Sequence, residues 1–277
     1  MNRKVIISCA ITGSRTAGNN VPITPEQQAE DIVKIARAGA AQVHIHARDE
    51  NGVNTMSPDR WVEIFTLSRK RLAEEGLDII FNPTSAGRGY TAEERVAHLP
   101  FIMPEMTSYD VGTLNWTFNS VAEHSPEFLD KCARACLELK IKPEIEIFSA
   151  GMIDSANYWI EQGLIAPPPY FQFVLGVGGG MEGTAENMAY LQRHLPKGAL
   201  WSASGVGKAH LPVLLSALAM GADGVRCGME DNVYMDRGVP ATNEQLVIRT
   251  VEFCLLANRE IATAAEAREI LGLVKHI

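Results

Sequence analysis

Two histidines separated by one residue, His44 and His46, are the side chains whose types and spacing most directly indicate chemistry. Side chains alternate across a strand, so a strand over 42–47 places both imidazoles on one face, about 6.6 Å apart along the chain. Imidazole nitrogens at this spacing can converge on one ion with bonds of about 2.0–2.1 Å. A hydrogen-bonded pair of core histidines is the alternative, but two such rings at the end of a strand favour a metal site.

A carboxylate near the end of the chain completes the predicted metal site. Catalytic zinc normally takes three protein ligands and keeps one position open for water or substrate. Glu230 follows the last predicted strand with the same parity as Arg226, so we expect it to be the third ligand, with Asp231 as its rival. Two histidines and one carboxylate can polarise a carbonyl or activate a water, so the ligands alone do not choose the reaction.

A group of charged residues is expected beside the metal. Arg226 should point into the fold, where an arginine needs anionic partners to offset its desolvation. Asp231, Glu144 and Glu146 are the candidate partners, and the two glutamates alternate with isoleucines so that both face inward. Burial raises the pKa of a carboxyl group and a neighbouring arginine lowers it, which suits general acid–base catalysis. The alternative is a buried ion network that only holds the fold together.

Strand-like apolar runs alternate with helical patterns along the whole chain, which predicts an α/β fold. Helices should begin at Thr24-Pro25 and Ser57-Pro58, each a cap followed by proline. Eight strands fit a (β/α)8 TIM barrel that forms one domain over 1–277, with an open doubly wound sheet as the runner-up. We expect an extra C-terminal helix outside the barrel, over 262–268. The predicted strands are 5–12, 42–47, 79–83, 107–112, 143–148, 171–176, 200–204 and 224–228.

Composition excludes several classes of partner. The net charge is -8 and the lysines and arginines form no basic stripe, which argues against nucleic acid. No apolar run approaches the roughly twenty residues of a membrane span, and no signal peptide is recognisable, so we expect no membrane partner and a cytoplasmic protein. The five cysteines are an odd number and lie among apolar neighbours, so we expect reduced thiols rather than disulfides.

Several segments resemble the β-keto acid cleavage enzymes, of which 3-keto-5-aminohexanoate cleavage enzyme is typical. The similarity runs nearly end to end, and His-x-His-x-Arg-Asp together with Gly-Met-Glu-Asp-Asn makes it specific. The segments that carry it are 22–26, 38–49, 142–148, 173–177, 228–232 and 265–271.

The resemblance implies a zinc-dependent barrel that converts a β-keto acid and acetyl-CoA into acetoacetate and a new acyl-CoA. By similarity, His44, His46 and Glu230 would bind one zinc ion per subunit. Asp231, held by Arg226, would remove the C2 proton, and the resulting enolate would attack the thioester before a retro-Claisen cleavage. Zinc makes this feasible because it stabilises the charge of the enolate. The family also implies a homo-oligomer, a tetramer.

Hydroxyl groups are the expected contacts to the substrate. The resemblance matches Thr84 and Ser108 to family positions that touch the substrate or its tetrahedral intermediate, with Ser85 and Thr107 as rivals. One of the two inward glutamates should match a family glutamate near the Arg–Asp pair, and the sequence leaves open which one.

The first loop departs from the family pattern. Members that take an amino-substituted keto acid place an acidic residue there, whereas this chain has Arg15 within Thr12–Thr16. Arginine cannot pair with an ammonium group, so we expect a substrate whose distal end is neutral or anionic.

Two other functions remain open. A metal-dependent aldolase or hydrolase could use the same ligands without CoA, and the discriminating observation is whether turnover needs acetyl-CoA. A barrel that keeps its metal only as a structural staple would turn over no candidate substrate, and Asp231→Asn would change nothing.

Overall fold

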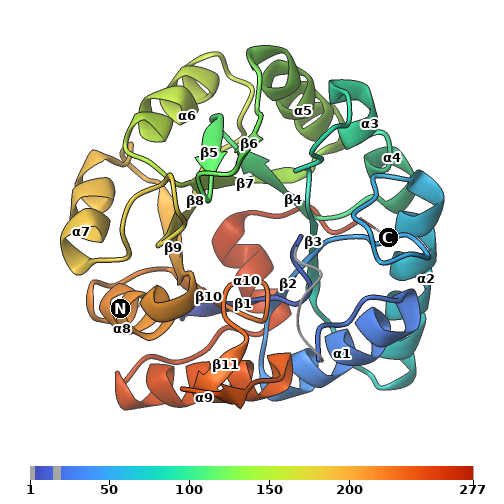
Figure 1. Cartoon of the computed structure of the whole chain (residues 1–277), viewed down its shortest axis with the longest axis vertical. Coiled ribbons are helices and arrows are strands. Elements are labelled where there is room, and N and C mark those ends of the chain that lie inside the picture. The colour runs from blue at the N-terminus through green and yellow to red at the C-terminus, as the bar shows by residue number, and fades with distance from the viewer. Residues whose placement is uncertain (1–3, 15–19, 277) are drawn as a thin grey trace.

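The sheet of the barrel is the central feature of the computed structural model, which describes residues 4–14 and 20–276. Eight parallel strands follow the order β3-β2-β1-β10-β9-β8-β7-β4, and helices surround them (Figure 1). This arrangement confirms the predicted (β/α)8 class and excludes the open doubly wound sheet. The strands are β1 (Ile6–Ala10), β2 (Gln42–Ile45), β3 (Ile80–Pro83), β4 (Met106–Asp110), β7 (Lys142–Ile147), β8 (Tyr170–Leu175), β9 (Leu200–Gly205) and β10 (Gly224–Cys227).

Each strand is buried on both faces, and the two faces differ in chemistry. Along β7, Ile145 and Ile147 join the apolar layer under the helices, whereas Glu144 and Glu146 face the barrel interior. The same alternation places Val43 and Ile45 in that layer and leaves His44 inward. The apolar layer therefore lies between sheet and helices, and the barrel interior is free for polar residues.

Helix starts follow the predicted caps with one difference. Thr24 accepts from the backbone of Gln27 in a full capping box, and Pro25 opens the helix. Ser57 precedes Pro58 as expected but makes no side-chain cap. The helices of the barrel wall are α1 (Pro25–Ala38), α2 (Pro58–Glu74), α3 (Ala92–Val96), α4 (Leu99–Ile102), α5 (Pro126–Leu139), α6 (Gly151–Glu161), α7 (Ala185–His194), α8 (His210–Ala219) and α9 (Asn243–Leu256).

Side chains close the barrel between its two end strands, β3 and β4, which lie next to each other. The Thr107 hydroxyl donates to the Pro83 carbonyl at 2.8 Å. Ser85 donates through its hydroxyl to the Ser108 carbonyl at 2.6 Å, and its backbone N–H reaches the Ser108 hydroxyl at 3.1 Å. These bonds satisfy groups that a ladder satisfies elsewhere in the sheet.

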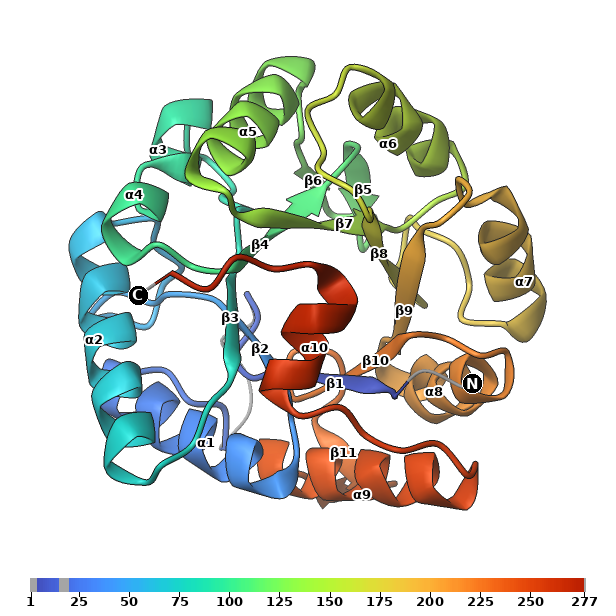
Figure 2. The ribbon, with the colours of Figure 1, turned by 180° about the vertical axis from the view of Figure 1, so that it is seen from behind.

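The C-terminal helix α10 (Ala264–Leu271) exists as predicted, but it does not join the outer ring. It lies across the N-terminal opening of the barrel (Figure 2), where Ala267 and Leu271 pack in one apolar cluster with Ile6, Ile80 and Met106. The opposite opening is therefore left as the place for a site, as in other barrels of this class.

Two hairpins that the sequence did not predict extend the loops at that opposite, C-terminal end. The first, β5 (Leu114–Trp116) with β6 (Ser120–Ala122), follows β4. The second, β11 (Tyr234–Asp236) with β12 (Val239–Pro240), follows β10. Among the described residues, no helix combines the length and apolar character that crossing a membrane requires.

Candidate active site

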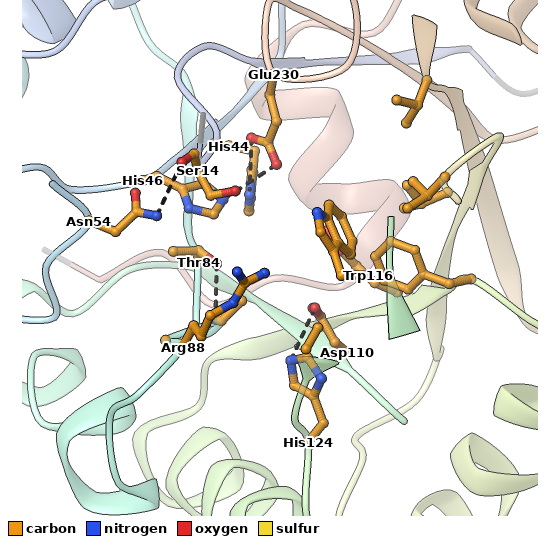
Figure 3. Close-up of a pocket in the computed structure, with 18 of the residues that line it drawn as sticks. Ser14, His44, His46, Asn54, Thr84, Arg88, Asp110, Trp116, His124 and Glu230 are labelled. Atoms are coloured by element: carbon orange, nitrogen blue, oxygen red, sulfur yellow. Dashed lines mark hydrogen bonds and ion pairs between the residues drawn. The ribbon is translucent and has the colours of Figure 1, made fainter. Parts of the chain in front are cut away.

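A cavity of about 200 Å³ opens at the C-terminal end of the barrel (Figure 3). A water molecule occupies about 30 Å³ in the liquid, so the cavity holds roughly seven waters or one small acid. One wall is apolar and is formed by Trp116, Phe148, Val174, Val177 and Val206. The rest is mainly polar and includes the histidine pair and the charged residues that follow the strands.

The two histidines and Glu230 converge at this cavity, as predicted. His44 Nε2 lies 3.6 Å from Glu230 Oε2, and His46 Nε2 lies 3.4 Å from Oε1. The two rings are 5.1 Å apart between centroids and nearly perpendicular. One donor atom from each residue lies within 4.8 Å of the others, which is the arrangement of a three-ligand metal site.

The loop that carries Glu230 depends on close backbone approaches. Gly228 has a φ of 128°, and a Cβ atom there would lie 2.2 Å from the Ala10 carbonyl oxygen at the end of β1. The Glu230 N–H donates to the same carbonyl at 3.1 Å. Gly228 therefore lets the loop fold onto β1, and this contact turns Glu230 back toward β2.

Protonation and bonding at His44 and Glu230 fit a cation. Burial lowers the pKa of His44 to about 3, so its ring is neutral near pH 7. Burial opposes the charge on Glu230, but the two imidazoles and Arg226 hold the pKa of its carboxyl well below the ordinary value. Its Oε2 is buried and accepts no hydrogen bond from the described residues. The neutral imidazole of His44 and the ionised carboxylate of Glu230 are in the states that a metal requires.

Arg226 is the centre of the charged group. Its Nε and Nη2 donate to the two carboxylate oxygens of Asp231 at 3.0 and 3.1 Å, and Nη1 donates to Glu146 at 2.9 Å. Nη2 also lies 3.0 Å from Glu230 Oε1. Burial alone would lower the pKa of Arg226, but these carboxylates hold it well above the ordinary value. The guanidinium thus fixes Asp231 next to the metal ligands.

The structure separates the two glutamates that the sequence could not distinguish. Glu146 lines the cavity and pairs with Arg226, and burial together with the neighbouring Asp110 raises the pKa of its carboxyl. Glu144 lies deeper, where Gln42 and Asn82 donate to its oxygens at 2.8 and 2.6 Å. Burial raises the pKa of Glu144 as well, and among the described residues Arg226 donates to Glu146 and Asp231 but not to Glu144. A second possible metal group, His44 with these two glutamates, is thus already occupied by protein donors.

The hydroxyl groups predicted to contact the substrate fall into two sets. Ser85, Thr107 and Ser108 make the bonds that join β3 to β4, and their hydroxyls are occupied there. Thr84 lines the cavity, and its oxygen accepts the Ala86 N–H at 3.0 Å and lies 3.5 Å from the Ser108 hydroxyl oxygen. Thr84 is therefore the candidate that the geometry places in reach of a substrate. Arg15 lies outside the described residues.

Sequence reasoning missed an aspartate–histidine pair in the cavity wall. Asp110 Oδ2 is 3.2 Å from His124 Nε2, and both residues are buried. Burial alone would raise the pKa of Asp110, but His124 and then Arg95 hold it below the ordinary value. Strand parity could have indicated Asp110, two residues after Ser108. His124 is brought to the cavity by the hairpin β5–β6, which the sequence did not predict. Arg88 lies in a loop whose sequence has no periodic pattern.

The sequence model of the beta-keto acid cleavage enzyme family matches residues 4–273. The chain belongs to this family. A 3-keto-5-aminohexanoate cleavage enzyme of Fusobacterium nucleatum is 35% identical over 99% of this chain and all of its own length. Two further relatives are a 3-oxoadipate:acetyl-CoA acetyltransferase of Cupriavidus necator, 34% identical over 99% of this chain and 96% of its own, and a 3-dehydrocarnitine:acetyl-CoA trimethylamine transferase of Rhizobium meliloti. The latter is 31% identical over 99% of this chain and 98% of its own.

A solved structure supports the fold of this family member. The apo structure of ObcA matches with a TM-score of 0.79 and 23% identity over 92% of this chain and 66% of the ObcA chain. This chain therefore spans about two thirds of ObcA, and the likeness concerns the fold. The sequence relatives are named as cleavage enzymes and acetyl-CoA transferases, so this member of the beta-keto acid cleavage enzyme family is an enzyme.

Proposed function

We propose that this enzyme exchanges acyl groups between a β-keto acid and acetyl-CoA and releases acetoacetate and a new acyl-CoA, with zinc as its metal. The observation that carries the proposal is that two groups of side chains line one cavity. They are the ligand group His44, His46 and Glu230, and the Arg226–Asp231 pair beside it. The names of the relatives, which combine keto acids with acetyl-CoA, support the same reaction.

Zinc is the metal that this donor set favours. Two imidazole nitrogens and one carboxylate oxygen form a mixed nitrogen and oxygen site that zinc commonly occupies in hydrolytic and carbonyl chemistry. The buried Oε2 of Glu230, which lacks a hydrogen-bond donor among the described residues, is a position that a cation would satisfy. When bound, zinc would supply positive charge next to the developing enolate oxygen and reduce the cost of removing a proton from C2.

Asp231 is the base in this proposal. Both of its oxygens accept from Arg226, which fixes the carboxylate in one orientation beside the ligand group. Asp231 takes the C2 proton, and the C2 carbanion forms a bond to the thioester carbonyl carbon of acetyl-CoA as CoA thiolate leaves. The thiolate then attacks the original keto carbon, the C2–C3 bond breaks, and Asp231 returns its proton to C2.

The cavity limits how the two substrates bind. About 200 Å³ accommodates a small keto acid, but not the nucleotide part of CoA. The CoA arm therefore enters through the open C-terminal end of the barrel. Thr84 lies in the cavity wall, and its hydroxyl is the proposed donor to a substrate oxygen.

The substrate's distal end is neutral or anionic in our proposal. The sequence basis is the loop Thr12–Thr16, which has no acidic side chain and contains Arg15. Purified enzyme should therefore turn over a neutral or anionic β-keto acid with higher kcat/KM than a cationic one of the same length. A preference for the cationic acid contradicts this part.

We also propose a homotetramer, as the family resemblance implies. Leucines with exposed side chains lie on adjacent wall helices, Leu215 on α8 and Leu255 and Leu256 on α9, and they offer apolar surface for such contacts. Light scattering on the purified protein tests this by its mass, because a monomer of 30.3 kDa contradicts it.

The direct test of the proposed function is a screen of β-keto acids with acetyl-CoA, read by release of acetoacetate. At least one acid should give acetoacetate and a matching acyl-CoA in equal amounts, and neither product should form when acetyl-CoA is omitted. Consumption of the keto acid at the same rate without acetyl-CoA supports instead a metal-dependent aldolase or hydrolase.

A further inference from the structure

Arg88 is a charged residue of the cavity that the proposed chemistry leaves without a task. It lies in the loop between β3 and α3 and lines the cavity with an exposed side chain. Its guanidinium end points into the cavity between Thr84 and Trp116 (Figure 3). Among residues 4–14 and 20–276, no hydrogen bond or ion pair to Arg88 is present, although Arg226 in the same cavity pairs with several carboxylates.

The loop holds Arg88 in place from both sides. Ala86 donates its N–H to Thr84, and Tyr90 donates its N–H to the Gly87 carbonyl. Gly87 is packed so closely that a Cβ atom there would lie 2.9 Å from side chains of Arg95 and Met56. The backbone next to Arg88 is thus anchored, and its side chain extends over the cavity from a defined position.

The charge balance of the cavity rim favours an anion as the missing partner. Within the described part of the chain, Glu123 is the other exposed charged residue of the lining, but the Arg95 guanidinium lies close to it and donates to its backbone carbonyl at 3.0 Å. A cationic ligand would therefore meet a carboxylate that already has a cation nearby, and it would also meet Arg88. An anionic ligand can form a bidentate, charge-assisted pair with the unpartnered guanidinium.

We propose that Arg88 binds the second carboxylate of a dicarboxylic β-keto acid and so selects that substrate class. This inference rests on the proposed function and names its substrate. In this arrangement the first carboxylate and the keto oxygen face the ligand group, and the distal carboxylate reaches the guanidinium that points into the same cavity. The phosphates of CoA are separated from its acetyl end by the pantetheine arm, so a group that points inward meets the keto acid rather than a phosphate.

The test compares three six-carbon probes that differ in their distal charge: 3-oxoadipate, 3-oxohexanoate and 3-keto-5-aminohexanoate. In the zinc-loaded enzyme with saturating acetyl-CoA, Arg88→Gln should lower kcat/KM for 3-oxoadipate by about tenfold to a hundredfold, because a charge-assisted pair is lost. It should leave the value for 3-oxohexanoate within about twofold. Arg88→Lys should retain part of the preference, and Arg88→Glu should shift it toward the cationic acid. Arg193→Gln, which removes an exposed arginine of α7, is the matched control.

Other outcomes overturn the inference. Equal losses for the dicarboxylic and the neutral acid assign Arg88 a general role, and no loss for either removes it from recognition. A raised KM for acetyl-CoA that is absent with acetyl-pantetheine assigns Arg88 to a CoA phosphate instead.

Calorimetry without acetyl-CoA separates this inference from the proposed function, because binding then occurs without exchange. Tighter binding of 3-oxoadipate than of 3-oxohexanoate, lost in Arg88→Gln, supports the inference even if the screen finds no acetoacetate. Acetoacetate release combined with equal affinities for the two acids, before and after the substitution, overturns the inference and leaves the proposed function intact.

Discussion

The carboxylate of Asp231 is held by the guanidinium of Arg226, and this contact fixes the position from which Asp231 can act as a base. Both oxygens accept from Arg226, so the side chain cannot turn away from the ligand group without losing two charge-assisted bonds. The residue is buried and lines the cavity, which places it where a proton can be taken from a bound acid.

Asp231→Asn should lower kcat by about a hundredfold to ten-thousandfold, because an amide keeps the shape of the side chain but cannot accept the C2 proton. Zinc content and folding should be unchanged. Steady-state kinetics and metal analysis measure both, with the exposed Asp154→Asn on α6 as the control. Full activity in Asp231→Asn contradicts its role as the base and favours a metal that acts only as a staple.

The two interior glutamates should respond differently to the same substitution. Glu146→Gln should lower kcat/KM by about tenfold or more, because Arg226 loses one anion and can move away from Asp231. Glu144→Gln should keep most of the activity, because the amides of Gln42 and Asn82 can turn to satisfy a third amide. The same kinetic assay measures both variants, and equal losses contradict this assignment.

Residue types and strand parity were sufficient to predict that His44, His46 and Glu230 converge and that Arg226 pairs with Asp231. The histidines lie on one strand, and Glu230 follows Arg226 by four residues, so local spacing carried the information. Asp110, His124 and Arg88 were missed because their place in the cavity depends on a hairpin and a loop whose folding no short pattern specifies.

At the scale of elements, two hydrogen bonds of Asn243 connect the helices α1 and α9 with the loop that carries Glu230. Asn243 at the start of α9 donates to Asp31 of α1 at 2.6 Å and accepts from the Met229 N–H at 2.7 Å. Burial raises the pKa of Asp31 from 3.8 to about 6, although Asn243 and Lys34 oppose the rise. The folded protein therefore holds this proton over a pH range in which the unfolded chain has released it.

Asp31→Asn should stabilise the protein more at pH 8 than at pH 5. The raised pKa means that the free energy of unfolding falls as the pH rises from about 4 to 6, and the whole cost of the buried charge is present above that range. The substitution removes this cost, which is between about 1 and 3 kcal/mol. Urea unfolding at the two pH values measures it, and an equal effect at both contradicts the assignment.

The order and type of the barrel elements could be predicted because apolar strands and capped helices alternate with regular spacing. The position of α10 could not be predicted, because a short amphipathic helix can pack in the outer ring as well as across the N-terminal opening. The contact between β3 and β4 was also missed. Serine and threonine side chains bond across it in place of a backbone ladder, and the three residues concerned, Ser85, Thr107 and Ser108, were candidates for substrate contact.

For the whole molecule, the apolar core of the barrel and the candidate metal site lie in different places. The apolar layer lies between sheet and helices and α10 covers one end, whereas the ligand group lies at the other. Metal removal should therefore leave the fold intact and lower the midpoint of thermal unfolding, since a ligand that binds only the folded state adds about 4 kcal/mol at a thousand times its Kd.

Chelation followed by zinc addition measures this effect by thermal unfolding. Zinc should restore both the midpoint and the activity of the native enzyme and should have no effect on a variant in which His44 and His46 are both alanine. The same upward shift of the midpoint in that variant contradicts the assigned ligands.

The most direct test of acyl exchange follows the carbon atoms of acetyl-CoA. The enzyme is given an unlabelled β-keto acid and acetyl-CoA with ¹³C at both acetyl carbons, and the products are analysed by NMR. The proposed reaction puts the label in C3 and C4 of acetoacetate, leaves C1 and C2 unlabelled, and gives an unlabelled acyl-CoA. Unlabelled acetoacetate, or consumption of the keto acid while the label stays in acetyl-CoA, contradicts the exchange.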